Sequence, residues 1–461
     1  MGKEFSIESV EVPQVETKHR RIVTTIPAPG SIATLETLRN IEPISMRGQP
    51  PVVWDRAEGV QVYDAHGNMW LDFSCGVLVT NAGHGTKAIR DAIRDQVDSG
   101  LIHNYCFASE ERAELVSLLI DIAPDGLEKV FLLTTGSEAT ECAIKLARTH
   151  GIAKGGTKKI GIIGSERAFH GRTLASQMTG GIPGQKDWIV NLDPAITQVP
   201  WPDGYWTEDT SFDLFLKTIE ERGLGPEKIA GVMFETFQGV GPDFAPVEYI
   251  QQLREWCDVN DVVLIFDEVQ AGFGRTGKLW AFEHYGVTPD LICIGKGVTS
   301  SLPLSGVIGK TEIMDSYPPG SMTSTHTGNP LSCRAAIASI RSLIDDDLIG
   351  NAAKLESVML NAINTIAVKH SDIVGRVSAK GLVGGLQILE SGTKKPSHDI
   401  AFDIVERCFR KGLLLFAPVG AWGQTVKLAP PLCITQEAME EGLEVLAECV
   451  YETVGAMAEV A

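Results

Sequence analysis

One lysine and one aspartate in this sequence stand where covalent chemistry on amines is feasible. Lys296 follows the apolar run 291–295 (LICIG) and precedes a stretch of small and apolar residues, and no other charged side chain occurs from Leu291 to Gly309. Most lysines are solvated surface groups. A lysine in dry surroundings instead has a lowered pKa and becomes a nucleophilic amine, as Schiff-base chemistry requires.

Asp267 follows five apolar residues, 262–266 (VVLIF), that predict a buried strand. The strand would deliver a carboxylate at its C-terminal end, where open α/β sheets bind their ligands. Taken alone, an Asp-Glu pair is more often a solvated turn. The lysine downstream favours the functional interpretation.

A third candidate lies where the apolar run 130–134 (VFLLT) gives way to a helical pattern in TTGSEATECAIKLAR (134–148). Backbone N–H groups of Gly136 and Ser137 would then point outward at a helix N-terminus, which suits a phosphate group. An ordinary strand-to-helix turn with a serine cap explains this segment about as well. The phosphate cradle, the strand-end acid and the isolated lysine together are more specific than any one alone.

Two other patterns carry no site. The segment GFGRTGKL (272–279) resembles a nucleotide-binding loop, but Leu279 stands where a hydroxyl must reach magnesium. His103 and Cys106 come nearest to a metal-binding pair. Because no second pair follows at ligand spacing, we expect no metal.

The elements that position these residues alternate between short apolar runs and amphipathic helices, which predicts an α/β fold with a mostly parallel sheet covered by helices on both faces. The runs expected to be strands are 130–134, 160–164, 231–235, 262–268 and 291–295. The segment GVQVYDAHGNMWLDF (59–73) predicts a hairpin. The expected domains are an N-terminal arm with part of a small domain (1–75), a large domain (76–335) and a C-terminal small domain (336–461).

Composition restricts the class of protein. The formal net charge of -19 argues against nucleic-acid or anionic-membrane partners, since those surfaces require clustered Lys and Arg. No apolar run approaches the roughly 18 to 20 residues that span a bilayer. The N-terminal residues lack the pattern of a secretory signal. The nine cysteines form no CxxC pair, so we expect reduced thiols and a cytoplasmic enzyme.

At these residues the sequence resembles the class III (ω-) aminotransferases of the fold-type I pyridoxal-phosphate enzymes, with 4-aminobutyrate aminotransferases among the close relatives. The resemblance runs in unbroken order over about 30–450. It rests on DFSCGVLVTNAGHG, TTGSEATECAIKLAR, FHGRT, ETFQG, IFDEVQAGFGRTGKLWAFEHYGVTPDLICIGKG and THTGNPLSC. It implies a large sheet-containing domain plus a smaller α+β domain built from the two chain ends.

The resemblance also implies roles for single residues. Lys296 would form the covalent link to pyridoxal 5'-phosphate and carry the proton between substrate and cofactor, and Asp267 would pair with the pyridine nitrogen. Further cofactor contacts are implied for Gly136, Ser137, Phe169, Glu235, Val269 and Gln270, and for Thr325 of the partner subunit. A site shared between chains implies a homodimer or a higher homo-oligomer.

Substrate residues follow less directly. Arg172 matches the arginine that grips a carboxylate remote from the reacting carbon, and Val77 would line the same pocket. Two positions depart from the resembled enzymes, with Val240 in place of a loop glutamate and Lys427 in place of an arginine. The implied reaction moves an amino group from a 4-aminobutyrate-like donor to 2-oxoglutarate or pyruvate, with ping-pong kinetics. A racemase, epimerase or decarboxylase on the same fold is the alternative, and a cofactor-binding protein without turnover is a second.

Overall fold

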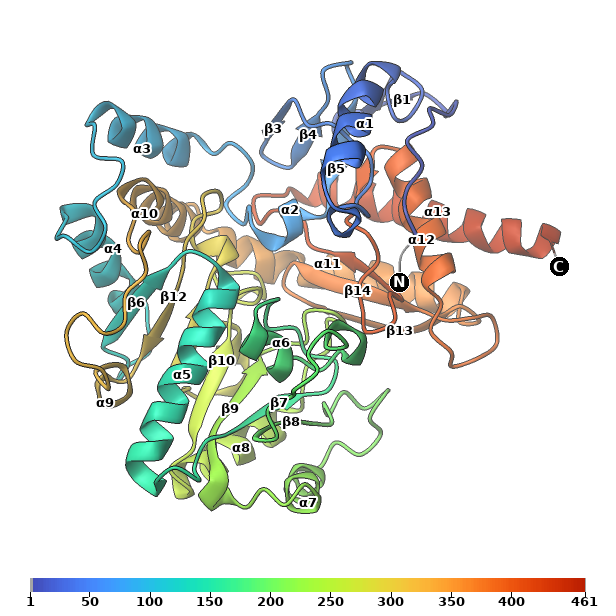
Figure 1. Cartoon of the computed structure of the whole chain (residues 1–461). Coiled ribbons are helices and arrows are strands. Elements are labelled where there is room, and N and C mark those ends of the chain that lie inside the picture. Colours follow the sequence, from blue (N-terminus) through green and yellow to red (C-terminus); the bar gives the residue numbers. More distant parts are fainter. Residues whose placement is uncertain (1–2, 461) are drawn as a thin grey trace. The chain divides into compact units, whose positions relative to one another are not determined.

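The computed structural model describes residues 3–460, and the chain divides into two compact units (Figure 1). Unit 1 combines Met1–Thr86 with Gly350–Ala461, and unit 2 is Lys87–Ile349. The predicted boundary at 335/336 falls inside α10 (Pro330–Asp345), which packs against α3 and α4 of unit 2. Both chain ends therefore contribute to one unit, and the middle of the chain forms the other.

Unit 2 is built on a sheet that, within the described residues, has seven strands in the order β6-β12-β11-β10-β9-β7-β8. Neighbouring strands pair in parallel except β12, which is antiparallel to both β6 and β11. The strands are β6 (Lys129–Leu133), β7 (Gly161–Ser165), β8 (Ile196–Val199), β9 (Ile229–Glu235), β10 (Val263–Asp267), β11 (Leu291–Ile294) and β12 (Ser305–Gly309). The predicted mostly parallel sheet is confirmed, although β8 and β12 are missing from the prediction.

Apolar side chains cover both faces of this sheet. Successive strand residues point to opposite faces, and Met233 and Ile265 belong to the apolar cluster that includes the buried side of α5 (Gly136–Gly155). In Figure 1, α5 runs alongside β10 and β9. The next residue along β9, Phe234, packs edge-on against Trp201 with ring centroids 5.6 Å apart. The strands are thus buried on two sides and present mainly their ends.

The other helices of unit 2 are short to medium in length. They are α3 (Lys87–Asp98), α4 (Glu110–Asp121), α6 (Leu174–Thr179), α7 (Phe212–Glu221), α8 (Val247–Val259) and α9 (Thr311–Met314), with 3-10 turns η3 (Pro183–Gln185), η4 (Pro226–Lys228), η5 (Ala281–Tyr285) and η6 (Lys296–Val298).

The part of unit 1 that the structure describes contains two sheets. The larger has the strand order β1-β2-β5-β4-β3, with β15 added beside β5, and the smaller has the order β13-β14-β16. The predicted hairpin is present as the antiparallel pair β4 and β5. The strands are β1 (Val15–Glu16), β2 (Arg21–Ile22), β3 (Arg56–Glu58), β4 (Gln61–Tyr63), β5 (Met69–Asp72), β13 (Val374–Lys380), β14 (Val383–Ile388), β15 (Leu413–Leu414) and β16 (Thr425–Leu428).

Its helices include the predicted C-terminal one. They are α1 (Ile32–Ile41), α11 (Leu348–Lys369), α12 (His398–Arg410) and α13 (Gln436–Val460), with 3-10 turns η1 (Pro29–Ser31) and η2 (Ile44–Met46). No helix among residues 3–460 is long and apolar enough to cross a membrane.

The element labelled α2 (Cys75–Leu78) in unit 1 is a left-handed turn. Its four successive φ angles are 52, 56, 63 and 61°. The turn is closed by hydrogen bonds from Leu78 N to Ser74 O (3.1 Å) and from Val79 N to Cys75 O (2.8 Å). Left-handed backbone costs an L-residue other than glycine about 1–2 kcal/mol. Since Gly76 is the only glycine in α2, this turn stores strain that neighbouring contacts must offset.

Candidate active site

The candidate site forms where four parallel strands of unit 2 end. Asp267, the last residue of β10, pairs in register with Glu235 at the end of β9 and with Cys293 of β11. Lys296 follows Cys293 by three residues, and His170 lies in the loop after β7. The acid and the lysine named from the sequence therefore come from adjacent strand ends.

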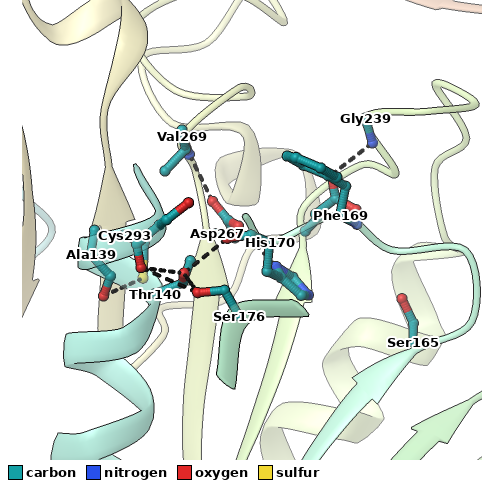
Figure 2. A network of polar contacts seen from close by, with 12 residues as sticks. Ala139, Thr140, Ser165, Phe169, His170, Ser176, Gly239, Asp267, Val269 and Cys293 are labelled. Atoms are coloured by element: carbon teal, nitrogen blue, oxygen red, sulfur yellow. Dashed lines mark hydrogen bonds and ion pairs between the residues drawn. The ribbon is translucent and has the colours of Figure 1, made fainter. Parts of the chain in front are cut away.

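Asp267 is a buried carboxylate, 6% exposed, with one partner on each oxygen (Figure 2). Its Oδ1 accepts a hydrogen bond from Val269 N at 3.1 Å, and its Oδ2 lies 2.8 Å from His170 Nδ1. Burial opposes protonation of His170, but the hydrogen bond and charge of Asp267, with the charge of Glu235, raise the pKa of its imidazole overall. The two contacts therefore hold the Asp267 side chain in place at the edge of the sheet.

His170 was not assigned a role from the sequence. The ring is buried, and its Nε2 has no hydrogen-bond partner among the described residues. The signal available in the sequence was its place in FHGRT, between two residues that were assigned roles. Its contact with Asp267 spans 97 positions and follows from the strand order of the sheet, so the motif alone does not disclose it.

Glu235 organises the loops around Asp267. Its Oε2 accepts from Phe169 N at 3.0 Å and its Oε1 from Gly239 N at 2.9 Å. Burial raises the pKa of Glu235 to about 7, with the charge of His170 acting against the shift and that of Asp267 adding to it. The carboxyl group thus fixes the backbone that carries Phe169.

Lys296 is half-buried at the start of η6. Burial lowers the pKa of its amine, while the charges of Asp267 and Glu235 oppose the shift. Among residues 3–460, its Nζ makes no hydrogen bond or ion pair. Lys296 also has a φ of 43°, a left-handed conformation that a residue of this type adopts only where its surroundings impose it.

The N-terminus of α5 lies beside the strand ends. Thr135 caps it by accepting from Glu138 N at 3.3 Å, and Glu138 completes a capping box. The cap is therefore a threonine, and the alternative of a serine cap at Ser137 is wrong. A Cβ on Gly136 would lie 2.9 Å from Val269 Cγ1, so only glycine fits so close to that side chain.

Arg172 and Gln270 lie on loops near these groups. Arg172 is exposed, donates from its backbone N to Ser137 Oγ at 3.2 Å, and places its guanidinium carbon 5.6 Å from the centre of the Phe169 ring. Gln270 is half-buried and lies against Gly239, where an added Cβ would come within 2.7 Å of its Oε1. A cation, an aromatic ring and an amide thus lie on loops around the buried carboxylates.

The remaining candidates belong to other elements of the chain. Thr325 is exposed in the loop before α10, which Thr327 attaches to β6 by donating to Leu132 O. Val77 is exposed on the left-handed turn of unit 1, and Lys427 is 2% exposed in β16 of the same unit. No group of three or more His, Cys, Asp or Glu side chains suited to a metal occurs within residues 3–460.

Comparison with known proteins agrees with this geometry. Residues 44–450 match the family model described as aminotransferase class-III. The chain is 32% identical over 442 residues to a 4-aminobutyrate aminotransferase of Mycobacterium leprae, covering 93% of this chain and 97% of that protein. It is 33% identical over 419 residues to a 5-aminovalerate aminotransferase of Pseudomonas aeruginosa, covering 87% and 94%. A transaminase structure from Virgibacillus matches with a TM-score of 0.83 at 26% identity, covering 92% of this chain and all of that one (100%).

The chain therefore belongs to the class III aminotransferases. It is a pyridoxal-phosphate-dependent aminotransferase of fold type I, as the resemblance in its motifs implied. The strand-end residues fit that cofactor. They offer a buried carboxylate, a half-buried lysine whose pKa is lowered, and a helix N-terminus at Gly136 and Ser137.

Proposed function

We propose that this enzyme moves the terminal amino group of an ω-amino acid or amine, of the 4-aminobutyrate kind, to a 2-oxo acid such as 2-oxoglutarate or pyruvate. The proposal includes a ping-pong sequence of two half-reactions and a homodimer acting in the cytoplasm. The names of the two relatives, which concern 4-aminobutyrate and 5-aminovalerate, support the substrate class. An exposed arginine, Arg172, near the strand ends supports a substrate that carries a carboxylate.

The observation that carries the proposal is the placement of Lys296 and Asp267 on adjacent strand ends. When bound, pyridoxal phosphate supplies an electrophilic carbon and an electron-withdrawing ring that stabilises negative charge on the substrate carbon. Asp267 would face the ring nitrogen and keep it protonated, since a carboxylate close to that nitrogen favours its protonated form. His170 would hold the carboxylate in that orientation.

Lys296 would first anchor the cofactor and then move a proton at the reacting carbon. Both tasks need an amine that is neutral part of the time, and burial lowers the pKa of Lys296 in that direction. Because Lys296 Nζ makes no ion pair with the described residues, the amine would be free to move. The left-handed backbone at Lys296 would orient its side chain.

The surrounding groups would hold the cofactor in place. Gly136 and Ser137 would bind the phosphate with N–H groups at the positive end of a helix of 20 residues. Phe169 and Val269 would cover the two faces of the ring, with Glu235 fixing the first through its backbone. Gln270 would reach the phenolic oxygen, and Thr325 of the partner subunit would complete the phosphate site.

Substrate selection would depend on charge. Arg172 would grip a carboxylate far from the reacting carbon, with Val77 lining the same pocket. Lys427 would hold a carboxylate next to that carbon less firmly than an arginine, since a lysine offers a point charge in place of a planar fork. Val240, which stands in place of a loop glutamate, carries no charge that could oppose Lys427. We therefore propose Arg172 as the stronger anchor.

A matrix of donors and acceptors tests the function. Purified holoenzyme is incubated with 4-aminobutyrate, 5-aminovalerate or a simple amine, each with 2-oxoglutarate or pyruvate, and the new amino acid is quantified. We expect transfer of nitrogen, with parallel double-reciprocal lines. Conversion of the donor without nitrogen on any acceptor would favour a racemase, epimerase or decarboxylase, and an unchanged cofactor spectrum with every amine would favour binding alone. The family match favours neither alternative.

A further inference from the structure

Two buried hydroxyl groups of unit 2 lie between α5 and α6, behind the strand ends. Thr140 belongs to the second turn of α5 and Ser176 to α6, and both side chains are 0% exposed. Thr140 Oγ1 and Ser176 Oγ are 2.6 Å apart (Figure 2). Each hydroxyl has one proton, so one of them donates to the other, and the hydroxyl pair (Thr140 and Ser176) keeps one proton for a further acceptor.

The acceptors within reach of the hydroxyl pair are two backbone carbonyls. Thr140 Oγ1 lies 2.9 Å from His170 O and 3.0 Å from Ser137 O. Ser176 Oγ lies 3.2 Å from Ser137 O. The ring of His170 contacts Asp267, and Ser137 belongs to the helix N-terminus that suits the phosphate. The hydroxyl pair therefore contacts the backbone of both parts of the candidate site.

The loop that carries His170 packs directly on Ser137. Arg172 N donates to Ser137 Oγ at 3.2 Å. Gly171 has a φ of 136°, and a Cβ at this position would lie 2.4 Å from the same Oγ. The guanidinium carbon of Arg172 lies 5.6 Å from the centre of the Phe169 ring. Because the loop has no free space against Ser137, a shift of its backbone would move both of these side chains.

The next residue of α5 holds the start of α6 independently of the hydroxyl pair. Glu141 Oε1 accepts hydrogen bonds from Ala175 N at 2.8 Å and from Ser176 N at 3.1 Å. Removing the hydroxyl of Thr140 would therefore leave α6 attached to α5. The lost contact would be the one to the carbonyl of His170, within the loop.

We propose that Thr140 and Ser176 are positioning residues that fix the loop 169–172 against the phosphate site and so orient Arg172. They touch neither substrate nor cofactor, and they act through the backbone of the loop. The inference rests on the proposed function, in which Arg172 binds a carboxylate remote from the reacting carbon. It adds that the affinity for this carboxylate depends on two hydroxyl groups behind the loop. Substrates without a distant carboxylate do not depend on them.

The first test measures the loop itself. Thr140→Val removes the hydroxyl and keeps the shape of the side chain, and Thr140→Ser restores the hydroxyl. In the holoenzyme, hydrogen–deuterium exchange of the peptide that covers residues 169–173 should be about tenfold faster in Thr140→Val than in wild type, and within about twofold of wild type in Thr140→Ser. If Thr140→Val does not fold, Ser176→Ala removes the other hydroxyl and should also speed exchange. Exchange at the wild-type rate in the folded variants would overturn the inference.

The second test compares two donors that differ only in the distant carboxylate, 4-aminobutyrate and butylamine. In Thr140→Val the KM for 4-aminobutyrate should be about tenfold higher, with kcat within about threefold, and the KM for butylamine should stay within about twofold. Thr140→Ser should restore the KM for 4-aminobutyrate. Equal losses for both donors would show a general structural role and overturn the inference, even if the loop exchanges faster.

Thr149→Val is the matched control. Thr149 lies about 13 Å further along α5, and its hydroxyl makes contacts of the same kind, to Lys145 O at 2.9 Å and to Tyr317 Oη at 2.6 Å. This variant should leave both the exchange of residues 169–173 and the ratio of the two donors unchanged. If it alters them as much as Thr140→Val does, the positioning role is wrong.

The proposed function and this inference fail differently. If the wild-type enzyme transfers no nitrogen from any ω-amino acid, the proposed function fails, while the exchange of residues 169–173 still shows whether the hydroxyl pair holds the loop. If the wild type transfers nitrogen and Thr140→Val changes neither the exchange nor the ratio of the two donors, the proposed function stands and the positioning role is wrong.

Discussion

Replacing Asp267 by asparagine isolates the charge that the proposed mechanism needs. Asparagine has nearly the same shape, so its Oδ1 still accepts from Val269 N and its amide still faces His170 Nδ1, which lies 2.8 Å from the carboxylate in the wild type. What is lost is one buried negative charge. The loss also removes the main support for a protonated His170, whose pKa the hydrogen bond and charge of Asp267 raise against burial.

The expected loss of rate is bounded by electrostatics. A pair of unit charges about 4 Å apart interacts by about 4 kcal/mol at an effective dielectric constant of about 20. That energy corresponds to about a thousandfold in rate, and screening by His170 reduces it. We therefore expect the donor half-reaction of Asp267→Asn to slow on the order of a hundredfold or more, or about 2.7 kcal/mol.

Single-turnover stopped-flow measurement of the donor half-reaction, with cofactor-saturated enzyme, checks this. Glu268→Gln is the matched control, since Glu268 is the next residue and is also buried, but its oxygens accept from Ala281 N and Phe282 N in a structural role. The control should unfold at a lower temperature and keep its half-reaction rate within about threefold. A rate for Asp267→Asn within the same threefold would refute the reasoning.

Three further predictions concern the rest of the site. Hybrid dimers of Lys296→Ala and Thr325→Val chains should recover part of the activity, because one site then carries both lesions and the other neither; hybrids that form but stay inactive would place Thr325 in its own chain's site. Arg172→Ala should reduce kcat/KM for 4-aminobutyrate and 2-oxoglutarate about tenfold more than for simple amines or pyruvate, and Lys427→Arg should lower the KM for the 2-oxo acid; equal losses for all four substrates would make Arg172 structural. The pKa of Glu235 is about 7 in the folded protein, against an ordinary 4.5, so between these pH values the folded state keeps a proton that the unfolded state has released. The free energy of unfolding therefore falls as the pH rises from 4.5 to about 7. Denaturant titrations should show a smaller fall between pH 5 and 7 in Glu235→Gln, and an equal fall would contradict the shift.

The central strands were predictable from the sequence because each is a continuous apolar run. The segments 231–235 and 262–268 are buried on both sides, and such strands lack the alternation that leaves other elements ambiguous. Strand β12 (Ser305–Gly309), by contrast, contains two glycines and a serine and gives almost no signal. Its place between β6 and β11, antiparallel to both, is decided by tertiary packing.

The candidate site shows the same contrast between residues marked by a local pattern and residues placed by tertiary structure. Lys296 and Asp267 were recognisable because a charged residue ends or follows an apolar strand, which is a local pattern. His170 and the turn Cys75–Leu78 were not. The first acts through a partner 97 positions away, and the second has only one glycine to indicate a left-handed backbone. Long-range contacts and imposed strain leave little trace in local composition.

The most direct test of the account is nitrogen transfer by Lys296→Ala. The variant is saturated with pyridoxal phosphate, shown by its thermal unfolding to be folded, and given ¹⁵N-labelled 4-aminobutyrate with 2-oxoglutarate. Removing the amine deletes both the covalent anchor and the proton carrier, so we predict that label reaches the acceptor at least about a hundredfold more slowly than in wild type, with cofactor still held non-covalently. Transfer at a rate near that of the wild type would contradict the assignment of Lys296.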